Sequence, residues 1–498
     1  MHGKNVCLVV DLRTGEHLAQ IPGLIAVFRA AGWKTKVALK EYGGETQKLA
    51  QQAARDGYDV VLGYGGDGTL SAVLNGVMNG GSKSLVADIP GGTYNVWAGA
   101  IGIPNNPIQA ALAVVNSMTH TVDLGHIEVT GVTFPETGEK PLVKGDKKAK
   151  RSSRARQHFL LHVGIGLEAT MMAHISKPLK YRFGPLAFDL SMLKTLPRQH
   201  PFSLEIKQMD HAGNIERQWQ GEVWEVFVSK VPLFGGAMNI APEARADDGL
   251  LSVCLITANG PLKTVEQVFS LVTQRKLDEK TTEYFRGAHF SLQVPASMDV
   301  HVDGSITQLK DFLHTSEQQT LQQASNAEQV SVTYRFDVEP KAVRMAFPRT
   351  YNGALFTASP QKENGQQERD KHESASHNGT KGRHTRKKAE HSKQKTFYEI
   401  TVIGVAPVPE QQGTSLVAGT YKKQISDETE VVALRIDQHT HLLGDDNTPI
   451  PLTTIFALKE GETLVVEGEK SKRNVIEARS VTISSRGVQG VNHVDSTL

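Results

Sequence analysis

The chain contains few cysteines and no long apolar run, and each absence disfavours a class of protein. Only Cys7 and Cys254 occur among its 498 residues, each inside an apolar stretch typical of a strand. A disulfide framework is therefore excluded, and we expect a reducing compartment. No apolar run approaches the roughly 18–20 residues of a membrane-spanning helix, and Met1–Cys7 lacks the apolar core of a secretory signal. We expect a cytoplasmic protein rather than an integral membrane protein or a secreted one.

The formal net charge of +2 conceals an uneven distribution of charged residues. Glu136–Arg156 and Gln361–Lys395 each contain five more basic than acidic residues, whereas residues 396–498 contain five more acidic than basic ones. The two basic stretches are either solvated loops or segments attracted to an anionic membrane, at roughly 1 kcal/mol per Lys or Arg near the bilayer. Nucleic acid is disfavoured as a partner, because no aromatic side chains are interspersed to stack on bases.

The N-terminal part of the chain alternates between segments typical of strands and of helices. This alternation predicts βαβ units and a parallel sheet. The expected strands are Asn5–Val10, Thr35–Leu39, Tyr58–Gly63 and Leu85–Ile89, and the expected helices are His17–Ala31, Thr46–Asp56 and one that begins near Leu70. Beyond about Thr119 most apolar runs are typical of strands, which predicts a mainly antiparallel β domain. Five short strands between residues 397 and 484 predict a small β barrel.

Two glycine-rich loops follow neighbouring strands of the expected parallel sheet. The first is G-G-D-G-T over Gly65–Thr69, and the second is P-G-G-T-Y-N over Pro90–Asn95. Glycines allow backbone amides to approach a ligand, and the following helix begins with free N–H groups that attract anions. Asp67 would repel a bare phosphate, so the first loop indicates a metal–nucleotide complex or a base. Parallel strands place both loops at one edge of the sheet, and no P-loop or protein-kinase motif is present.

Four ordered motifs resemble those of the diacylglycerol and sphingosine kinase-type lipid kinases, a family related to NAD kinase and phosphofructokinase. The resemblance extends over Lys4–Pro348. Its motifs are VVLGYGGDGTLSAVLNGVM (Val60–Met78), IPGGTYNVWAGAIGIP (Ile89–Pro104), FGGAMNIAPEARADDGLLSV (Phe234–Val253) and VHVDGS (Val300–Ser305). Because the four motifs occur in order and at suitable spacing, the resemblance is specific.

The resemblance implies transfer of the γ-phosphoryl group of ATP, with Mg²⁺, to the hydroxyl of diacylglycerol or a related lipid alcohol. An alcohol that attacks phosphorus needs a carboxylate to accept its proton. By similarity the catalytic residues are Asp303, as general base, and Asp67. The resemblance implies nucleotide-binding residues Gly65, Gly66, Asp67, Gly68, Thr69, Gly92, Thr93 and Asn95, and a metal-binding turn made by Asp248 with the carbonyls of Arg245 and Leu250.

The sequence departs from the family pattern at several positions. Asp11 stands where the family has an asparagine, which adds negative charge near the phosphates, and Arg13 is a candidate to offset it. Ser305 replaces a glutamate of the late motif, so a second carboxylate is missing there. Two alternatives to a lipid kinase therefore stay open. One is a small-molecule kinase similar to NAD kinase, and the other is a nucleotide- or lipid-binding regulator that does not turn over.

We predict an α/β domain, a β-sandwich domain and a small OB-like β barrel. The expected partner is a lipid at a membrane surface, which the protein contacts peripherally, and no nucleic acid; whether the chain forms a homodimer is left open. The predicted boundaries are 1–122 with about 337–349 for the α/β domain, 123–336 with a basic insertion at 136–156 for the β sandwich, 350–395 for a flexible basic linker and 396–485 for the barrel.

Overall fold

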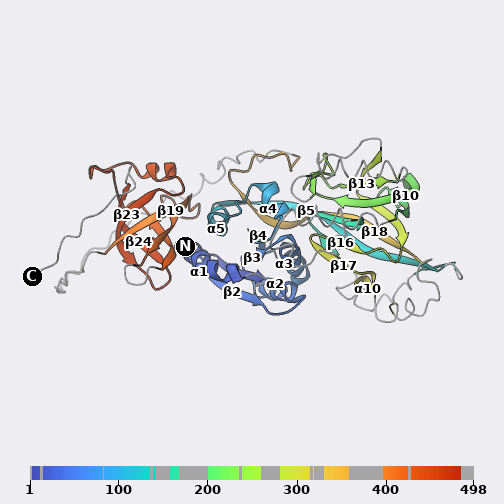
Figure 1. Cartoon of the computed structure of the whole chain (residues 1–498), viewed down its shortest axis with the longest axis horizontal. Helices are drawn as coiled ribbons and strands as arrows, with labels where there is room; N and C mark the ends of the chain where they lie inside the picture. The colour runs from blue at the N-terminus through green and yellow to red at the C-terminus, as the bar shows by residue number, and fades with distance from the viewer. Residues whose placement is uncertain are drawn as a thin grey trace, which may run out of the picture.

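The molecule consists of three bodies in a row, with the α/β domain in the middle, the C-terminal barrel on one side and the β domain on the other (Figure 1). The computed structural model describes residues 3–11, 15–81, 83–134, 138–141, 157–167, 200–234, 238–258, 281–313, 318, 330–357, 396–423 and 428–483. Arg13, most of the basic insertion at 136–156 and the basic stretch 361–395 lie outside these residues.

The α/β domain is built on a parallel sheet, as the alternation of strands and helices predicts. Strands run in the order β2-β1-β3-β4, and all three pairings are parallel. The central strands are buried on both faces because helices cover the sheet, which explains why they are mostly apolar. The strands are β1 (Asn5–Asp11), β2 (Lys34–Lys40), β3 (Val60–Gly65) and β4 (Leu85–Pro90); the helices are α1 (Gly15–Ala30), α2 (Glu45–Arg55), α3 (Asp67–Gly80), α4 (Val96–Ile101) and α5 (Pro107–Val115).

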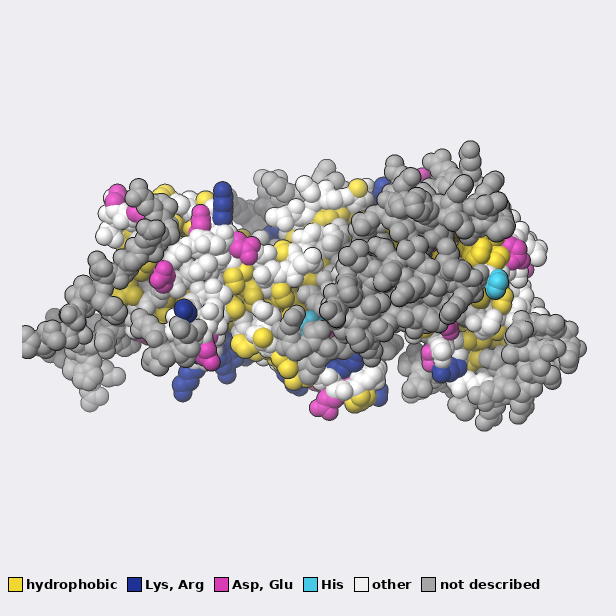
Figure 2. Space-filling model, in the orientation of Figure 1, with side chains coloured by type: hydrophobic (Ala, Val, Ile, Leu, Met, Phe, Trp, Pro, Cys, Tyr) yellow, Lys and Arg dark blue, Asp and Glu magenta, His cyan; other side chains and the backbone are white. Residues whose placement is uncertain are grey.

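Strand β2 forms the outer edge of the parallel sheet. Its sequence, KTKVALK, places lysines along an edge whose backbone groups would otherwise invite another strand to pair. In the space-filling view, Lys and Arg side chains gather along this lower border of the α/β domain (Figure 2). These charges therefore protect the edge of the sheet from unwanted pairing.

Two long strands join the α/β domain to the β domain. Strands β5 (Ser117–Phe134) and β18 (Ser331–Pro348) pair antiparallel along their lengths, and β18 also pairs parallel with β4 at Met345. Their register is irregular between Glu339 and Val343, where the ribbon passes from one domain to the other. Strand β18 thus takes part in both domains, and this shared strand fixes the position of one domain relative to the other.

The second domain is an antiparallel β structure, as predicted. Its strands extend the sheet in the order β17-β16-β8-β10-β9-β15-β18, with β13 paired to β10 and β14 paired to β13. The elements are β6 (Gly138–Pro141), β7 (Gln157–Phe159), β8 (His162–Gly166), β9 (Phe202–Met209), β10 (Ile215–Ser229), β11 (Leu233–Phe234), β12 (Met238–Asn239), β13 (Leu251–Thr257), β14 (Thr282–Gly287), β15 (His289–Pro295), β16 (Val300–Val302), β17 (Ser305–Thr307) and the short helix α10 (Leu309–Phe312).

The C-terminal region forms a closed barrel of five strands, which confirms the sequence prediction. Strands follow the order β21-β20-β19-β23-β24, and a parallel pairing between β21 and β24 closes the ring. The elements are β19 (Phe397–Pro407), β20 (Ser415–Lys422), β21 (Thr429–Ile436), β22 (His441–Leu443), the 3₁₀ helix η4 (Leu452–Ala457), β23 (Thr463–Lys470) and β24 (Val475–Ile483).

The barrel packs directly against helices α1 and α5 of the α/β domain. A Cβ at Gly23 would lie 2.8 Å from Val431 Cγ1, and the Gln109 side chain donates a hydrogen bond to the Ile403 carbonyl oxygen at 3.0 Å. The barrel therefore shares a core with the α/β domain instead of being attached only through a linker. Its buried residues in that shared core are Ala406, Val408, Leu416, Ala418, Ala433 and Val475.

The start of the predicted flexible linker is part of the folded structure. Leu355 and Phe356 are buried against the α/β core, and Thr357 donates two hydrogen bonds to the Asp247 carboxylate. The sequence prediction was wrong for residues 350–357, because two apolar side chains in this segment find a place on the core. The rest of the predicted linker lies outside the described residues.

We expect Gly23→Leu to detach the barrel from the α/β domain. The new side chain would meet both Val431 and Ile108, and overpacking of this kind destabilises by about 1–3 kcal/mol. A specific protease site inserted between Gln361 and Lys395 allows the contact to be measured. After cleavage, the barrel should co-elute with the rest of the protein in the parent chain and separate in Gly23→Leu. Gly43→Leu is the control, because a Cβ at Gly43 meets nothing within 4 Å; co-elution in both variants would contradict the packing argument.

Candidate functional site

The two glycine-rich loops lie against each other at the carboxyl edge of the parallel sheet. The Gly91 amide donates a hydrogen bond to the Gly65 carbonyl oxygen at 2.7 Å. A Cβ at Gly92 would lie 2.4 Å from the Gly66 Cα, so a side chain at that position would force the loops apart. The absence of side chains here leaves backbone amides close to any ligand at this edge.

The first loop is shorter than its motif suggests. Strand β3 continues to Gly65 and α3 begins at Asp67, so Gly66 alone separates strand from helix. Thr69 lies in the first turn, where its amide and that of Leu70 donate to the Gly66 carbonyl oxygen at 2.8 and 3.1 Å. The G-G-D-G-T motif thus places the positive end of a 14-residue helix at the sheet edge.

Asp67 joins the first loop to the helix that follows the second. Its carboxylate accepts hydrogen bonds from the amides of Val96 at 3.1 Å and Trp97 at 3.2 Å, at the start of α4. Burial raises the pKa of Asp67, and these two hydrogen bonds oppose the rise. A carboxylate with a raised pKa takes up a proton more readily than an ordinary aspartate.

Asn95 shapes the second loop from within. Its Oδ1 accepts a hydrogen bond from the Gly92 amide at 2.8 Å, and its Nδ2 donates to the Gly92 carbonyl oxygen at 3.1 Å. Asn95 adopts φ 48°, a left-handed conformation that asparagine tolerates better than most residues. Thr93 lies between these two residues and is partly buried. We therefore see Asn95 as the residue that holds the loop in its compact form.

Asp11 is neutralised by a residue that the sequence did not single out. Lys40 Nζ lies 3.2 Å from Asp11 Oδ2, and the Thr69 hydroxyl donates to the same oxygen at 3.3 Å. Asp11 is buried, so the ion pair matters more than an exposed one would. Lys40 is the last residue of the neighbouring parallel strand β2. It offsets the negative charge of Asp11, a role for which the sequence analysis had named Arg13. His17 completes this corner, with Nε2 3.0 Å from the Gly91 carbonyl oxygen.

Asp303 forms the turn between β16 and β17 and is fully buried. Its carboxylate accepts amide hydrogen bonds from Leu160 at 2.6 Å, Leu161 at 2.8 Å and His162 at 3.1 Å. Asp303 adopts φ 44°, and only 1% of the residue is exposed. Burial raises its pKa, and the amide hydrogen bonds oppose the rise. The three bonds hold the turn in a conformation that a residue other than glycine rarely adopts.

The Asp303 turn contacts the first turn of α3, so residues from both domains meet at one place. A Cβ at Gly304 would lie 3.1 Å from the Gly68 amide nitrogen and 3.7 Å from the Asp67 Cβ. A Cβ at Gly68 would lie 2.9 Å from the Ser305 hydroxyl oxygen. The structure therefore brings together Asp67 and Asp303, the two residues that the sequence analysis assigned to catalysis.

Asp88 is a buried carboxylate that the sequence analysis overlooked within the apolar strand β4. It is 5% exposed and lies in a strand whose six residues are all buried. Burial, and then repulsion by Asp67, raise the pKa of Asp88 well above its usual range. The signal that could have revealed it was a charged residue inside an otherwise apolar strand.

We expect Asp88→Asn to stabilise the protein increasingly as the pH rises from about 4 to 8. A raised pKa means that the folded state holds a proton that the unfolded chain releases above about pH 4, so stability is lost as the pH rises through the folded-state pKa. Asparagine imitates the protonated form and escapes this loss. Thermal unfolding of both proteins across this pH range measures the difference. Asp210→Asn is the control: its stability relative to the parent should not rise with pH, because hydrogen bonds from Asn214 lower the pKa of Asp210. A difference in stability between Asp88→Asn and the parent that stays constant with pH would contradict the argument.

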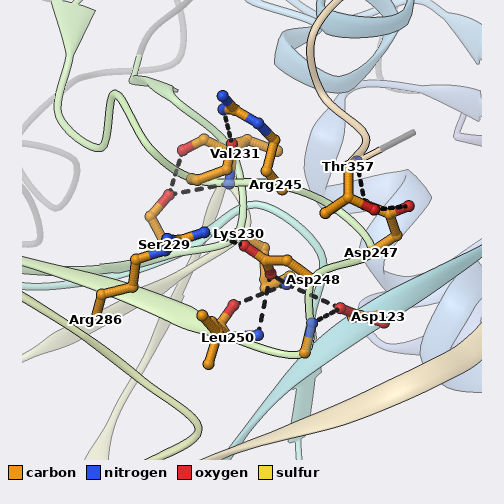
Figure 3. A network of polar contacts seen from close by, with 12 residues as sticks. Asp123, Ser229, Lys230, Val231, Arg245, Asp247, Asp248, Leu250, Arg286 and Thr357 are labelled. Atoms are coloured by element: carbon orange, nitrogen blue, oxygen red, sulfur yellow. Dashed lines mark hydrogen bonds and ion pairs between the residues drawn. The ribbon is translucent and has the colours of Figure 1, made fainter. Parts of the chain in front are cut away.

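The residues of the predicted metal turn do not fit a metal ion. Asp248 Oδ1 and the Leu250 carbonyl oxygen converge on one point, but that point holds the Lys230 ammonium group (Figure 3). The Arg245 guanidinium donates to the Ala244 carbonyl oxygen nearby. Among the described residues, no group of three or more His, Cys, Asp or Glu side chains is arranged to hold a metal. Mg²⁺ at this turn would have to compete with a fixed positive charge.

Comparisons with known proteins find matches for the α/β domain and for the β domain. Residues 6–127 match the family model of the diacylglycerol kinase catalytic domain, and residues 162–315 match that of the YegS C-terminal NAD kinase beta sandwich-like domain. A diacylglycerol kinase of Bacillus subtilis is 24% identical over 290 residues, which cover 58% of this chain and 84% of the relative. One of Staphylococcus aureus is 23% identical over 256 residues, which cover 51% and 70%.

A solved structure has the same fold over most of the chain. A crystal structure of a Bacillus anthracis protein superposes with a TM-score of 0.50 at 18% identity, over 70% of this chain and 97% of that one. Both family models end before the barrel begins. The two matched ranges follow each other in the order of the first two domains, so residues 6–127 resemble a diacylglycerol kinase catalytic domain and residues 162–315 resemble the beta sandwich-like domain of the second family model.

Proposed function

We propose that the protein is an ATP-dependent kinase that phosphorylates the hydroxyl of diacylglycerol or a related long-chain lipid alcohol. The observation that carries the proposal is the contact between the Asp303 turn and the first turn of α3. One partner is a helix N-terminus suited to phosphate, and the other is a carboxylate-bearing turn from the domain expected to hold the acceptor. The relatives named diacylglycerol kinase support the choice of acceptor.

In this proposal the backbone binds the phosphates and the carboxylates handle the proton. Those amides of the Gly65–Thr69 segment and of the second loop that do not donate within or between the loops bind the nucleotide phosphates, while Asn95 keeps the second loop compact. Mg²⁺ bound together with ATP would neutralise charge on the transferred phosphoryl group. Asp303 accepts the proton of the lipid hydroxyl, and its raised pKa suits that task. Asp67 orients the first loop through α4 and places a second carboxylate beside the reacting groups.

The acceptor is tested by incubating the protein with γ-labelled ATP, Mg²⁺ and separate acceptors, namely diacylglycerol, sphingosine and NAD. We expect a labelled phospholipid with diacylglycerol or another lipid alcohol. Labelled NADP formed without lipid would instead support a relative of NAD kinase. Binding of ATP with no transfer to any acceptor would support a regulator, the alternative that Ser305 favours because it leaves the late motif with one carboxylate.

We further propose that the enzyme meets its substrate as a peripheral protein at a membrane surface. None of the helices within the described ranges combines the length and the apolar character that a bilayer crossing requires. The basic stretches Glu136–Arg156 and Gln361–Lys395 supply charge that would attract anionic lipid. Sedimentation with vesicles of anionic and of neutral lipid tests this: binding to anionic vesicles should weaken with salt, and equal binding to both kinds would contradict it.

A further inference from the structure

Lys230 ends in a cluster of oxygen atoms at the boundary between the first two domains. It follows directly on β10, and its side chain is 1% exposed. Its Nζ donates to the Leu250 carbonyl oxygen at 2.8 Å, to Asp248 Oδ1 at 3.1 Å and to Asp123 Oδ2 at 3.2 Å (Figure 3). An ammonium group has three N–H donors, so each of them meets one acceptor. We call Lys230, Asp123, Asp248 and Leu250 the Lys230 node.

The node lies where the β5–β18 ribbon passes from one domain to the other. Asp123 belongs to β5 and is fully buried. Its carboxylate also accepts hydrogen bonds from the Lys341 amide at 2.8 Å and from the Gly249 amide at 2.7 Å. Lys341 lies in β18 at the register irregularity and adopts φ 52°. The node thus ties both strands of the ribbon to the turn that contains Asp248.

The charges around the node are already balanced by side chains. Asp248 Oδ2 forms a second ion pair, with Arg286 at 2.7 Å. The carboxylates of Asp123 and Asp248 are thus balanced by the cations of Lys230 and Arg286. A divalent ion added to this set would leave a net positive charge in a buried place, which is costly. The oxygen atoms also lie 2.8–3.2 Å from the Lys230 nitrogen, whereas Mg²⁺ and Ca²⁺ need oxygens at roughly 2.0–2.6 Å.

The node is linked to the Asp303 turn through one residue. The Lys230 amide donates to the Leu161 carbonyl oxygen at 2.8 Å, and the Leu161 amide donates to Asp303 Oδ1 at 2.8 Å. The Ser229 hydroxyl, 3.2 Å from the same Leu161 oxygen, reinforces this connection. A change in the position of Lys230 would therefore reach the segment that holds the Asp303 carboxylate.

We infer that Lys230 acts as a built-in cation that takes the place of a divalent metal at the domain boundary. The ammonium gathers the carboxylates and the carbonyl that a metal turn would use, so the arrangement of the two domains is independent of divalent ions. This inference concerns the cation at the boundary and stands whether or not a lipid is the acceptor.

The first test uses the unmodified full-length protein without nucleotide. Its thermal unfolding is compared in EDTA, in millimolar Mg²⁺ and in millimolar Mn²⁺. We expect the three melting temperatures to agree within about 1 °C, because a metal that binds only the folded state raises the melting temperature. A rise with either metal that disappears in Asp248→Asn would place a metal at the node and overturn the inference.

The second test asks whether removing the ammonium creates the metal site. In EDTA, Lys230→Ala should melt at least about 5 °C below the parent, because a buried carboxylate pair loses its partner. Millimolar Mn²⁺ should restore part of that loss, and Mn²⁺ titration followed by electron paramagnetic resonance should show one bound ion that the parent chain lacks. The control is Lys207→Met, which removes a half-exposed lysine of the same domain that pairs with Glu205.

A result in which Lys230→Ala melts like the Lys207 control would overturn the inference. Should Lys230→Ala fail to fold, Lys230→Arg keeps the charge but changes its shape, and it should remain metal-independent with a lower melting temperature. Binding of one Mn²⁺ to the parent chain that is lost in Asp248→Asn would also overturn the inference.

Discussion

Replacing Asp303 with asparagine is expected to lower kcat for phosphoryl transfer by about 10²- to 10⁴-fold, the usual contribution of a positioned acid or base. The substitution keeps the size of the side chain but removes the group that would accept the proton of the acceptor hydroxyl. Because burial raises the pKa of Asp303, the acidic limb of the pH–rate profile should lie above the value of about 3.9 typical of aspartate. The limb should be absent from the residual activity of the variant.

The same substitution also disturbs the turn, and the two effects can be separated. The two carboxylate oxygens accept three amide hydrogen bonds, and an asparagine would turn one oxygen into an NH₂ group facing an amide donor. A loss of about 1–3 kcal/mol in the free energy of unfolding is therefore expected as well. A purely structural role would lower the melting temperature yet leave the acidic limb where it was, and that outcome would contradict the role as base. Asp299→Asn, four residues before Asp303, is the control and should change neither quantity much.

The sequence predicts the α/β domain well, because its information is local. An unbroken apolar run such as Val6–Val10 indicates a strand buried on both faces, and parallel strands bring the two glycine loops to the same edge of the sheet. The start of α3 was placed too late, near Leu70, because the periodicity of apolar residues reveals only the buried face. The first turn, from Asp67, faces the site and carries no apolar residue to mark it.

The sequence does not predict contacts between residues far apart in the chain. Lys230 follows an apolar strand and looks like a lysine at the end of that strand facing water, since its three acceptors come from Asp123 and from a turn some 20 residues later. The resemblance implied a metal-binding turn made by Asp248 with the carbonyls of Arg245 and Leu250, but Asp248 and the Leu250 carbonyl surround the Lys230 ammonium group instead. The identity of the cation between them depended on a residue outside the motif.

Docking of the barrel escaped prediction for a related reason. The apolar residues of α1 that face the barrel are indistinguishable by pattern from those that face the sheet. Pro22 and Gly23 lie inside the continuous helix α1, and in a sequence they count only as weak helix formers. The small size of Gly23 makes sense only once Val431 is known to lie against it.

Gly92→Ala is expected to reduce kcat/KM for ATP by about 10²-fold, the loss that a displacement of about 1 Å typically causes at a reacting centre. The added methyl group would lie 2.4 Å from the Gly66 Cα and 2.9 Å from Asn95 Oδ1. Backbone cannot move aside as the end of a side chain can, so the two loops must separate. Their separation would break the hydrogen bond between Gly91 and Gly65 and move the amides that bind phosphate.

A matched substitution in the same part of the chain distinguishes this effect from the general cost of changing a glycine. Gly99 lies in α4, where a Cβ meets nothing within 4 Å. Gly99→Ala should therefore keep kcat/KM and gain about 0.5–1 kcal/mol of stability, because alanine favours a helix more than glycine does. Steady-state kinetics and the dissociation constant for ATP, measured for both variants and the parent, complete the comparison. Equal ATP affinity in Gly92→Ala and Gly99→Ala would show that the contact between the loops does not form the nucleotide site, and Asp67 and Asn95 would then have to act through some other arrangement.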